Sequence, residues 1–303
     1  MSLSVIIPVF NEEQNIYPLY GEIKNYLLPV DELIYVDDGS TDNTFLEIQQ
    51  ISSSDNTIKC ISLSRNFGHQ NALMAGLEHA KGEYIITMDG DLQHPPELIP
   101  AMVEKLKEGY DIVITKRTKT NGGIIKSIFS KIFYRFINSI SDTRIEPNAS
   151  DFRAFNKKVL SNILLFKERE LFLRGIFSWI GFKTATISFE APSRRFGKTK
   201  YSYGKMTKLA LKGITSFSFR PLRIAIMIGT IISLTAFAFG IFALVSYYKG
   251  NTVPGWASTI IAIMFLGGTQ LLAIGLLGEY IASLFIESKN RPLYLINKKI
   301  NID

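Results

Sequence analysis

The chain has 303 residues, of which 47% are hydrophobic and 12% aromatic. This composition excludes a disordered or low-complexity protein, and the length suffices for one large domain or two smaller domains with cores of their own. The net charge of +7 is spread unevenly, because residues 1–60 hold ten acidic side chains against two lysines, whereas residues 190–223 hold nine basic side chains against one glutamate. Such asymmetry indicates a basic surface that faces nucleic acid or a membrane.

The first 116 residues alternate between strand and helix patterns. Apolar runs rich in β-branched residues predict strands at 3–9, 33–36, 59–64, 83–88 and 112–116. Helical periodicity, N-cap residues and a Pro-Pro start predict helices at 11–26, from about 44, at 69–80 and from 95 to about 108. This alternation predicts an α/β fold with a mostly parallel sheet, in which ligands bind at the carboxyl ends of the strands.

Polar side chains follow four of the predicted strands: Asn11 and Glu12, Asp37 and Asp38, Arg65 and Asn66, and Asp89 and Asp91. Because side chains alternate along an extended chain, we expect Asp89 and Asp91 to lie on one side of it. Two carboxylates there favour a hard divalent ion, Mg²⁺ or Mn²⁺, which keeps coordination positions for substrate phosphates. A solvated turn is the alternative for these acids, and a helix cap is the alternative for the pair after the second strand. No G-x-G-x-x-G follows the first strand, so dinucleotide binding by that route is not expected.

The cysteine and the histidines show no metal-binding pattern. Cys60 is the single cysteine, which excludes a disulfide framework and a thiol-based metal site. His69, His79 and His94 lack zinc spacing, and we expect each to be solvated or locally hydrogen-bonded.

Two long uncharged runs follow, at 224–248 and 250–278. A helix needs about 20 apolar residues to cross a bilayer, so both runs predict membrane-spanning helices, with a buried helix of a soluble core as the alternative. Basic residues precede the first run and follow the second, whereas the connector carries only Lys249. The positive-inside rule then predicts a hairpin in the cell membrane, with both termini, and hence the α/β domain, in the cytoplasm. We therefore expect a membrane, and no nucleic acid, as the partner of the basic surface.

Several segments, in their order and spacing, resemble family 2 glycosyltransferases: VIIPVFNEE, VDDGSTDNT, SRNFGHQNALMAGLEHAKGEY and MDGDLQHPPELI. Further segments resemble the bactoprenol glucosyltransferase branch of the polyprenyl-phosphate glycosyltransferases, which is related to dolichol-phosphate mannose synthase: SDFRAF, ERELFLRGIFSWIGF and the second apolar run with its tail. The resemblance covers nearly the whole chain. It implies a GT-A fold and the inverting transfer of a hexose, with glucose preferred, from a UDP-sugar to polyprenyl (undecaprenyl) phosphate for glycan modification.

The resemblance also implies roles for individual residues. It places the nucleotide-sugar beside Pro8, Phe10, Glu12, Asp37, Asp38, Arg65 and Asn66. It assigns the ion, Mg²⁺ or Mn²⁺, to Asp89, Asp91 and Gln93. It assigns the acceptor phosphate to Arg117, Arg194, Arg195, Lys198 and Lys200, the last four of which could instead contact anionic lipid headgroups. Asp151 and Arg153 are counted with the catalytic residues, where they would orient the sugar hydroxyls or support the metal site, and a buried ion pair is their alternative.

These expectations divide the chain into a glycosyltransferase domain at 1–204, a juxtamembrane amphipathic helix at 205–223, two transmembrane helices at 224–286 and a cytoplasmic tail at 287–303. An amphipathic helix at 123–140 either lies in the membrane interface or packs on the sheet. Two spans leave much apolar surface uncovered, so we expect a homo-oligomer.

Three alternatives stay open. The donor sugar could be mannose, galactose or an aminoarabinose derivative in place of glucose. A polysaccharide synthase would need more spans and a Gln-x-x-Arg-Trp site, whereas Arg174 and Trp179 are not adjacent. A non-enzymatic nucleotide-binding membrane protein would usually have lost its acids, whereas Asp89 and Asp91 are both present.

Overall fold

The computed structural model describes residues 2–118, 149–169, 171–190, 192, 220–249 and 255–302. These residues divide into two compact units. The first holds the described residues up to 192 together with 291–302, and the second holds 220–249 and 255–290. The helix predicted at 123–140 and residues 205–219 of the helix predicted at 205–223 lie outside the described residues, whereas residues 220–223 are helical.

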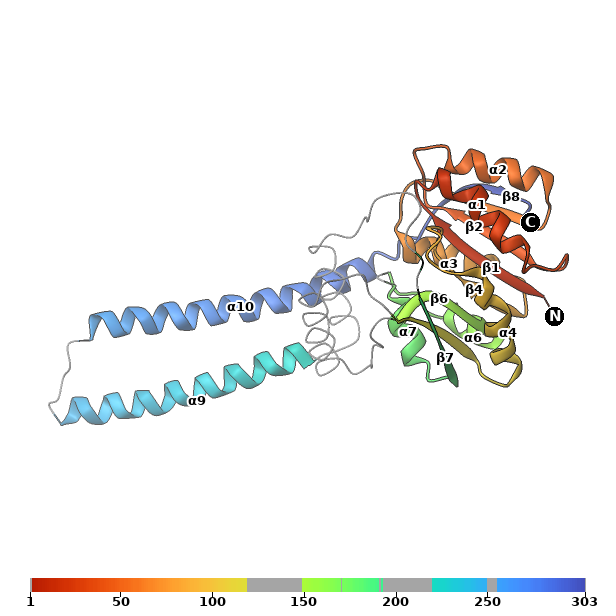
Figure 1. Ribbon diagram of the computed structural model, residues 1–303. Helices are drawn as coiled ribbons and strands as arrows, with labels where there is room; N and C mark the ends of the chain where they lie inside the picture. Colours follow the sequence, from red (N-terminus) through yellow and green to blue (C-terminus); the bar gives the residue numbers. More distant parts are fainter. Residues whose placement is uncertain are drawn as a thin grey trace. The chain divides into compact units, whose positions relative to one another are not determined.

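Strands and helices alternate along the first unit (Figure 1). Its elements are β1 (Leu3–Val9), α1 (Glu13–Lys24), β2 (Glu32–Asp37), α2 (Thr44–Ser54), β3 (Ile58–Leu63), α3 (His69–His79), β4 (Tyr84–Thr87), η1 (Pro96–Leu98), α4 (Ile99–Lys107), β5 (Ile112–Arg117), β6 (Ala149–Asn156), α6 (Lys157–Ile163), α7 (Leu173–Trp179), β7 (Thr184–Phe189) and β8 (Ile296–Ile300). The five strands and four helices predicted before residue 118 are present, with ends that differ by a few residues.

The strands form one sheet in the order β7-β5-β6-β4-β1-β2-β3-β8. Pairing is parallel between β1 and β2, β1 and β4, β2 and β3, and β5 and β7. Two strands run antiparallel to their neighbours: β6 lies between β4 and β5, and β8 lies beside β3. The prediction of a mostly parallel α/β sheet is therefore confirmed, whereas β6, β7 and β8 were not predicted.

Helices cover both faces of this sheet. All seven residues of β1 are buried, as expected for a central parallel strand. Val5, Ile7 and Val9 belong to a core with apolar residues of α1, α2 and α4. On the other face, Gly76 of α3 packs so tightly on β1 that a Cβ would lie 2.3 Å from Cγ2 of Ile6. This close packing fixes α3, and hence His69 at its first turn, against the sheet.

The residues predicted to form the tail contribute a strand to the sheet. Cys60 of β3 pairs with Ile300 of β8, and the amide of Asn301 donates to the carbonyls of Ser52 and Ile58 at 2.8 and 2.9 Å. The segment INKKI offers isoleucines only at its ends, so it lacks the apolar alternation from which a strand is predicted. Its place comes from pairing with β3, which periodicity does not reveal.

The second unit consists of two long apolar helices, α9 (Arg220–Tyr248) and α10 (Trp256–Ser288), which lie side by side with opposite chain directions (Figure 1). The stretches Ala225–Phe242 and Ala262–Ser288 are long and apolar enough to cross a membrane. Many of their large apolar side chains are exposed, as a lipid-facing helix requires. The two predicted membrane-spanning segments are thus confirmed as candidates by length and composition.

Gly39 allows the loop after β2 to lie against the loop after β3. Its φ is +69°, and a Cβ would lie 2.4 Å from the carbonyl carbon of Arg65. A left-handed backbone costs a non-glycine residue roughly 1–2 kcal/mol, and here the Arg65 backbone must also shift. We therefore expect Gly39→Ala to lower the free energy of unfolding by about 2 kcal/mol or more.

Gly21 serves as the matched control, because it lies in α1 with open space around its Cα. Gly21→Ala should raise stability by roughly 0.5–1 kcal/mol. Thermal unfolding of the purified full-length protein in detergent checks both changes. A Gly39→Ala midpoint equal to that of the wild type would contradict the packing described here.

Candidate active site

The carboxyl ends of β1, β2, β3 and β4 meet along one edge of the sheet, as in other parallel sheets. The structure brings most of the predicted site residues to this edge. Pro8 lies in β1 and Asp37 ends β2, while Phe10, Glu12, Asp38, Arg65, Asn66, Asp89, Asp91 and Gln93 lie in the loops that follow. Arg194, Arg195, Lys198 and Lys200 lie outside the described residues.

Asp37 and Asp38 are both buried and hold the backbone of neighbouring loops. The Asp38 carboxylate accepts hydrogen bonds from the N–H groups of Phe67 and Gly68, at 2.7 and 2.9 Å. The Asp37 carboxylate accepts from the Ser40 N–H and the Ser62 hydroxyl, each at 3.0 Å. Burial raises the pKa of Asp38 despite its two backbone donors. Both acids therefore shape the edge of the predicted nucleotide site, whatever contacts they also make with a ligand.

The loop after β1 is fastened to the loop after β2 by Asn11. Its backbone lies in the left-handed region at φ 51°, its N–H donates to the Ser40 hydroxyl at 2.9 Å, and its side-chain oxygen accepts from the Thr41 N–H at 2.8 Å. Glu12 accepts a bond from the Asn15 amide at 2.6 Å. The next loop along the edge exposes Arg65, whose guanidinium lies 4.2 Å from the centre of the Phe67 ring.

The chain turns sharply after β4, which ends at Thr87. Gly90 lies so close to β1 that a Cβ would be 2.6 Å from Cγ1 of Val9, and Leu92 takes a left-handed φ of 60°. A left-handed leucine is strained, and such strain is concentrated at functional sites. Because residues 90–92 form a bend, strand alternation does not govern where Asp89 and Asp91 point, so the premise of an extended chain was wrong here.

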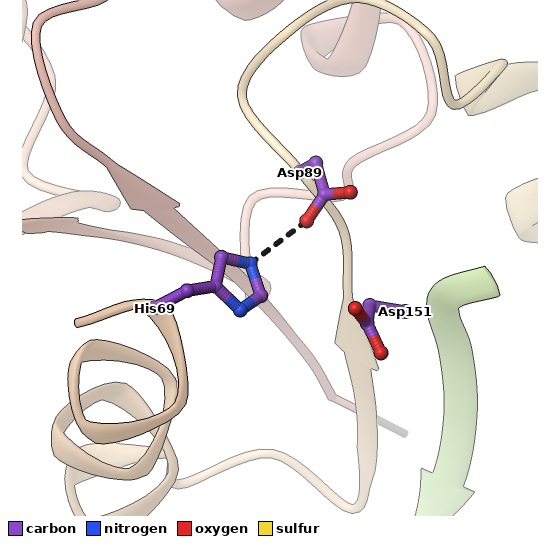
Figure 2. A group of neighbouring side chains, drawn as sticks. All are labelled: His69, Asp89 and Asp151. Carbon is purple, nitrogen blue, oxygen red and sulfur yellow. Dashed lines mark hydrogen bonds and ion pairs between the residues drawn. The ribbon is translucent and has the colours of Figure 1, made fainter. Parts of the chain in front are cut away.

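Asp89 points toward His69 and Asp151, not along a strand (Figure 2). Its Oδ1 lies 2.9 Å from Nε2 of His69, and one potential ligand atom from each of the three residues lies within 4.8 Å of the others. Burial alone would lower the pKa of His69, but the hydrogen bond and charge of Asp89 outweigh it and raise this pKa to about 9. The His69 ring thus carries a positive charge beside the two carboxylates, and it must lose a proton before its nitrogen can bind a metal ion.

The side chain of His94 holds the backbone of Asp89 in place. It is buried, and its Nδ1 accepts a hydrogen bond from the Asp89 N–H at 2.9 Å, so the proton of the neutral ring resides on Nε2. Nε2 can then donate to the Ser150 hydroxyl, 2.6 Å away. Burial lowers the pKa of His94, which agrees with a neutral ring. The centres of the His94 and Phe152 rings lie 5.3 Å apart in a stacked arrangement. This packing holds the His94 ring, and with it the turn at Asp89, in place.

Asp151 lies between two arginines. Arg174 of α7 donates to both carboxylate oxygens, at 2.9 and 2.7 Å, and Arg153 lies 3.9 Å away. Burial alone would raise the pKa of Asp151, but the charge and hydrogen bonds of Arg174 outweigh it and hold this pKa well below its usual range. Burial lowers the pKa of Arg153 only to about 10, so this guanidinium stays charged at neutral pH. The buried ion pair that was the alternative for Asp151 and Arg153 is therefore present.

Arg117 ends β5 beside the Asp89 turn. Its Nη1 donates to the side-chain oxygen of Gln93 at 3.4 Å, and its Nη2 lies 3.3 Å from Nε2 of His94. The backbone N–H of Gln93 donates to the carboxylate of Asp91 at 3.2 Å. A cation at this position faces the same edge of the sheet as the carboxylates, as the acceptor-phosphate assignment requires.

Three of these residues were not predicted to belong to the site: His69, His94 and Arg174. The expectation that the histidines are solvated or locally hydrogen-bonded holds for His79, which lies 2.8 Å from the Ala75 carbonyl. His69 and His94 also have near partners, Gln70 and the Asp89 N–H, but each contacts a distant residue as well, Asp89 and Ser150 respectively. Arg174 was considered only as part of a polysaccharide-synthase motif. A signal was available for His69, because it follows the third strand and so faces the same edge as the acids.

These side chains have the chemistry of a divalent-cation site. Carboxylate oxygens suit Mg²⁺ and Mn²⁺, and an imidazole nitrogen favours Mn²⁺ over Mg²⁺ in such a set. The cluster of His69, Asp89 and Asp151 therefore fits an ion of this class. Asp91 does not belong to this group of three.

Comparison with known proteins identifies the family. Residues 4–164 match the model of glycosyl transferase family 2, and the chain belongs to this family. It is 41% identical to the SfII prophage-derived bactoprenol glucosyl transferase of Shigella flexneri, with 98% of each chain covered. It is 42% identical to the prophage bactoprenol glucosyl transferase homolog of Escherichia coli strain K12, with 98% of this chain and 99% of that protein covered. The protein is thus a glycosyltransferase.

The fold also matches a solved enzyme structure. Crystalline TarS of S. aureus, residues 1–349 in complex with UDP-GlcNAc, aligns with a TM-score of 0.50 and 20% identity over 71% of this chain and 66% of that one. This likeness shows a shared fold, and the predicted GT-A architecture is confirmed.

Two ligand sets are possible for the ion: Asp89 with His69 and Asp151, or Asp89 with Asp91 and Gln93. Direct measurement of Mn²⁺ binding distinguishes them. We expect Asp89→Asn to remove most binding, because Asp89 belongs to both sets. We expect His69→Ala to weaken binding about 10-fold or more, and Gln93→Ala to change it little, because the Gln93 oxygen faces Arg117. Electron paramagnetic resonance of free Mn²⁺, titrated in the presence of UDP, gives the affinities. Weak binding by Gln93→Ala with normal binding by His69→Ala would place the ion on Asp91 and Gln93 instead.

Proposed function

We propose that this protein transfers glucose from UDP-glucose to polyprenyl phosphate, with inversion at the anomeric carbon, at the cytoplasmic face of the cell membrane. One observation carries the proposal. The similarity to bactoprenol glucosyl transferases extends over nearly the whole chain, so it includes the two apolar helices as well as the catalytic unit. If the acceptor is a lipid, the two helices would anchor the catalytic unit at the bilayer, where donor and acceptor must meet.

The acceptor itself supplies the nucleophile. A phosphate monoester has a second pKa of about 6, so it is mostly dianionic at neutral pH and needs no general base. What it needs is a cation to hold it beside an anionic donor. Arg117 is the described candidate, since arginine binds phosphate through two parallel hydrogen bonds. Attack in one step on the anomeric carbon expels UDP and inverts the configuration of the sugar.

The carboxylates serve the leaving group. A bound Mg²⁺ or Mn²⁺ supplies positive charge that neutralises the departing diphosphate. We assign Asp89 as a ligand of this ion. The structure places His69 and Asp151 beside Asp89, whereas the resemblance implies Asp91 and Gln93 as the other ligands. We assign the nucleotide to the neighbouring part of the edge, at Pro8, Phe10, Glu12, Asp37, Asp38, Arg65 and Asn66.

The membrane arrangement follows from charge. We propose that α9 and α10 cross the bilayer as a hairpin with both chain ends in the cytoplasm, because the connector carries one lysine while basic residues flank the outer ends. Strand β8 supports this, since it places the residues after α10 in the same unit as the candidate active site. The basic segment at 194–200 as an acceptor site, and the homo-oligomer, stay predictions.

Radiolabelled transfer tests the proposed function. Membranes containing the protein, incubated with UDP-[¹⁴C]glucose, undecaprenyl phosphate and Mn²⁺, should form a chloroform-soluble labelled product. Asp89→Asn should lower the rate at least about 100-fold without affecting membrane insertion. Labelled mannose, galactose or aminoarabinose donors in parallel reactions identify a different sugar. Absence of a glycolipid with every donor would refute the proposal.

Arg117 gives a sharper test of the acceptor site. Loss of a charged hydrogen bond costs about 1.5–3 kcal/mol, so Arg117→Ala should raise the KM for polyprenyl phosphate about 10- to 100-fold. The KM for UDP-glucose should change little. Lys183→Ala is the control, because Lys183 is exposed and lies over the ring of Tyr110. An Arg117→Ala enzyme with unchanged acceptor KM would remove Arg117 from this role.

A further inference from the structure

The C-terminal segment, residues 291–302, contacts the loop that follows β3 as well as β3 itself. Strand β8 of this segment pairs antiparallel with β3 up to the last residue of β3. Directly after that residue, the backbone N–H of Ser64 donates to the carbonyl of Leu295 at 2.9 Å. The loop continues with Arg65 and Asn66, to which we assign the nucleotide. The C-terminal segment therefore holds the first residue of a loop of the donor site.

Backbone contacts at both ends hold this loop. Residues 64–66 are exposed, so burial contributes little to the conformation of the loop. At its far end, the N–H groups of Phe67 and Gly68 donate to the buried carboxylate of Asp38. Asp38 thus fixes the end of the loop, and the carbonyl of Leu295 fixes its beginning.

Tyr294 ties the neighbouring Leu295 to helix α3. The Tyr294 hydroxyl donates to the carboxylate of Glu78 at 2.5 Å, and a hydrogen bond to a charged acceptor is a strong one. Glu78 lies in the last turn of α3, two residues after Gly76, which packs tightly against β1. Tyr294 is thus bonded to an element with a fixed position on the sheet. This contact holds the Leu295 carbonyl where the Ser64 N–H can donate to it.

A different contact holds the opposite end of β8. The side-chain amide of Asn301 donates to the carbonyls of Ser52, near the end of α2, and Ile58, at the start of β3. Because β8 runs antiparallel to β3, Asn301 lies beside the start of β3, away from the loop. The two ends of the C-terminal segment can therefore be loosened separately, at Tyr294 or at Asn301.

We propose that Tyr294 is a positioning residue of the nucleotide-sugar site. Through the Leu295 carbonyl and the Ser64 N–H, it holds the loop of Arg65 in the conformation that binds the donor. The inference rests on the proposed function, because it takes the nucleotide to bind at this loop. A strand that covers a sheet edge satisfies backbone groups that would otherwise be open. Here the covering segment also serves the donor site.

UDP binding to the full-length protein in detergent, measured by isothermal titration with Mn²⁺ present, tests the proposal. Tyr294→Phe removes the hydroxyl and should weaken UDP binding about 3- to 10-fold, the size expected for the loss of one hydrogen bond. Asn301→Ala is the matched control. It removes two hydrogen bonds at the opposite end of β8 and should leave the UDP affinity within about twofold of the wild type. A Tyr294→Phe affinity within that same range would overturn the proposal.

Hydrogen exchange separates positioning from a general loss of stability. The backbone amides of residues 64–68 should exchange faster in Tyr294→Phe and at the wild-type rate in Asn301→Ala. The unfolding midpoint should fall at least as far in Asn301→Ala, because this change removes more hydrogen bonds. Equal weakening of UDP binding in the two variants would show a purely structural role and would overturn the proposal.

Glu78→Ala removes the same hydrogen bond from its other partner. It should weaken UDP binding as Tyr294→Phe does, and the two changes together should weaken it little further. Should Tyr294→Phe fail to fold, Glu78→Ala decides the matter, and wild-type affinity in that variant would count against the proposal.

A failure of the proposed function would give a different result. Wild-type protein that binds UDP but forms no glycolipid would refute the transfer reaction, while the UDP affinities would still decide the role of Tyr294. Wild-type transfer with unaltered UDP binding in Tyr294→Phe would leave the function standing and remove the positioning role. Wild-type protein that binds no UDP would contradict both.

Discussion

Attraction between carboxylates and the cations beside them determines the geometry at the carboxyl edge of this sheet. Asp89 faces His69, and Asp151 faces Arg174, with ligand atoms of the two acids close enough to repel each other. Asp89 and Asp151 are 28% and 15% exposed, so loss of either neighbouring cation would leave a partly buried carboxylate without its partner. The neighbouring cations keep both carboxyl groups ionised. A divalent ion is bound by two carboxylates that lie close together in this ionised form.

Much of this edge could be predicted from the sequence because it follows from local patterns. Apolar runs separated by helical periodicity define parallel strands, and parallel strands end at a common edge. That argument alone places Asp38, Arg65 and Asp89 near one another. The two uncharged runs were equally clear, since length and lack of charge are sufficient to indicate a candidate membrane span.

The remaining features depend on contacts between segments that no periodicity connects. The pairing of Asp151 with Arg174 requires that β6 insert antiparallel beside β4 and that α7 pack on it. The burial of His94 depends on Phe152 and Ser150 of that same strand. The turn that follows Asp89 contains a left-handed Leu92, a conformation that a leucine side chain does not indicate. Motif resemblance supplied the family but could not supply these neighbours.

The nuclei coordinated to Mn²⁺ give the most direct test of the account, which rests on a cation seated between Asp89 and Asp151 beside His69. Electron spin echo modulation of the protein with Mn²⁺ and UDP detects a coordinated nitrogen. The account predicts a nitrogen signal that disappears in His69→Ala and persists in Gln93→Ala. Coordination by oxygen alone in the wild type would contradict it.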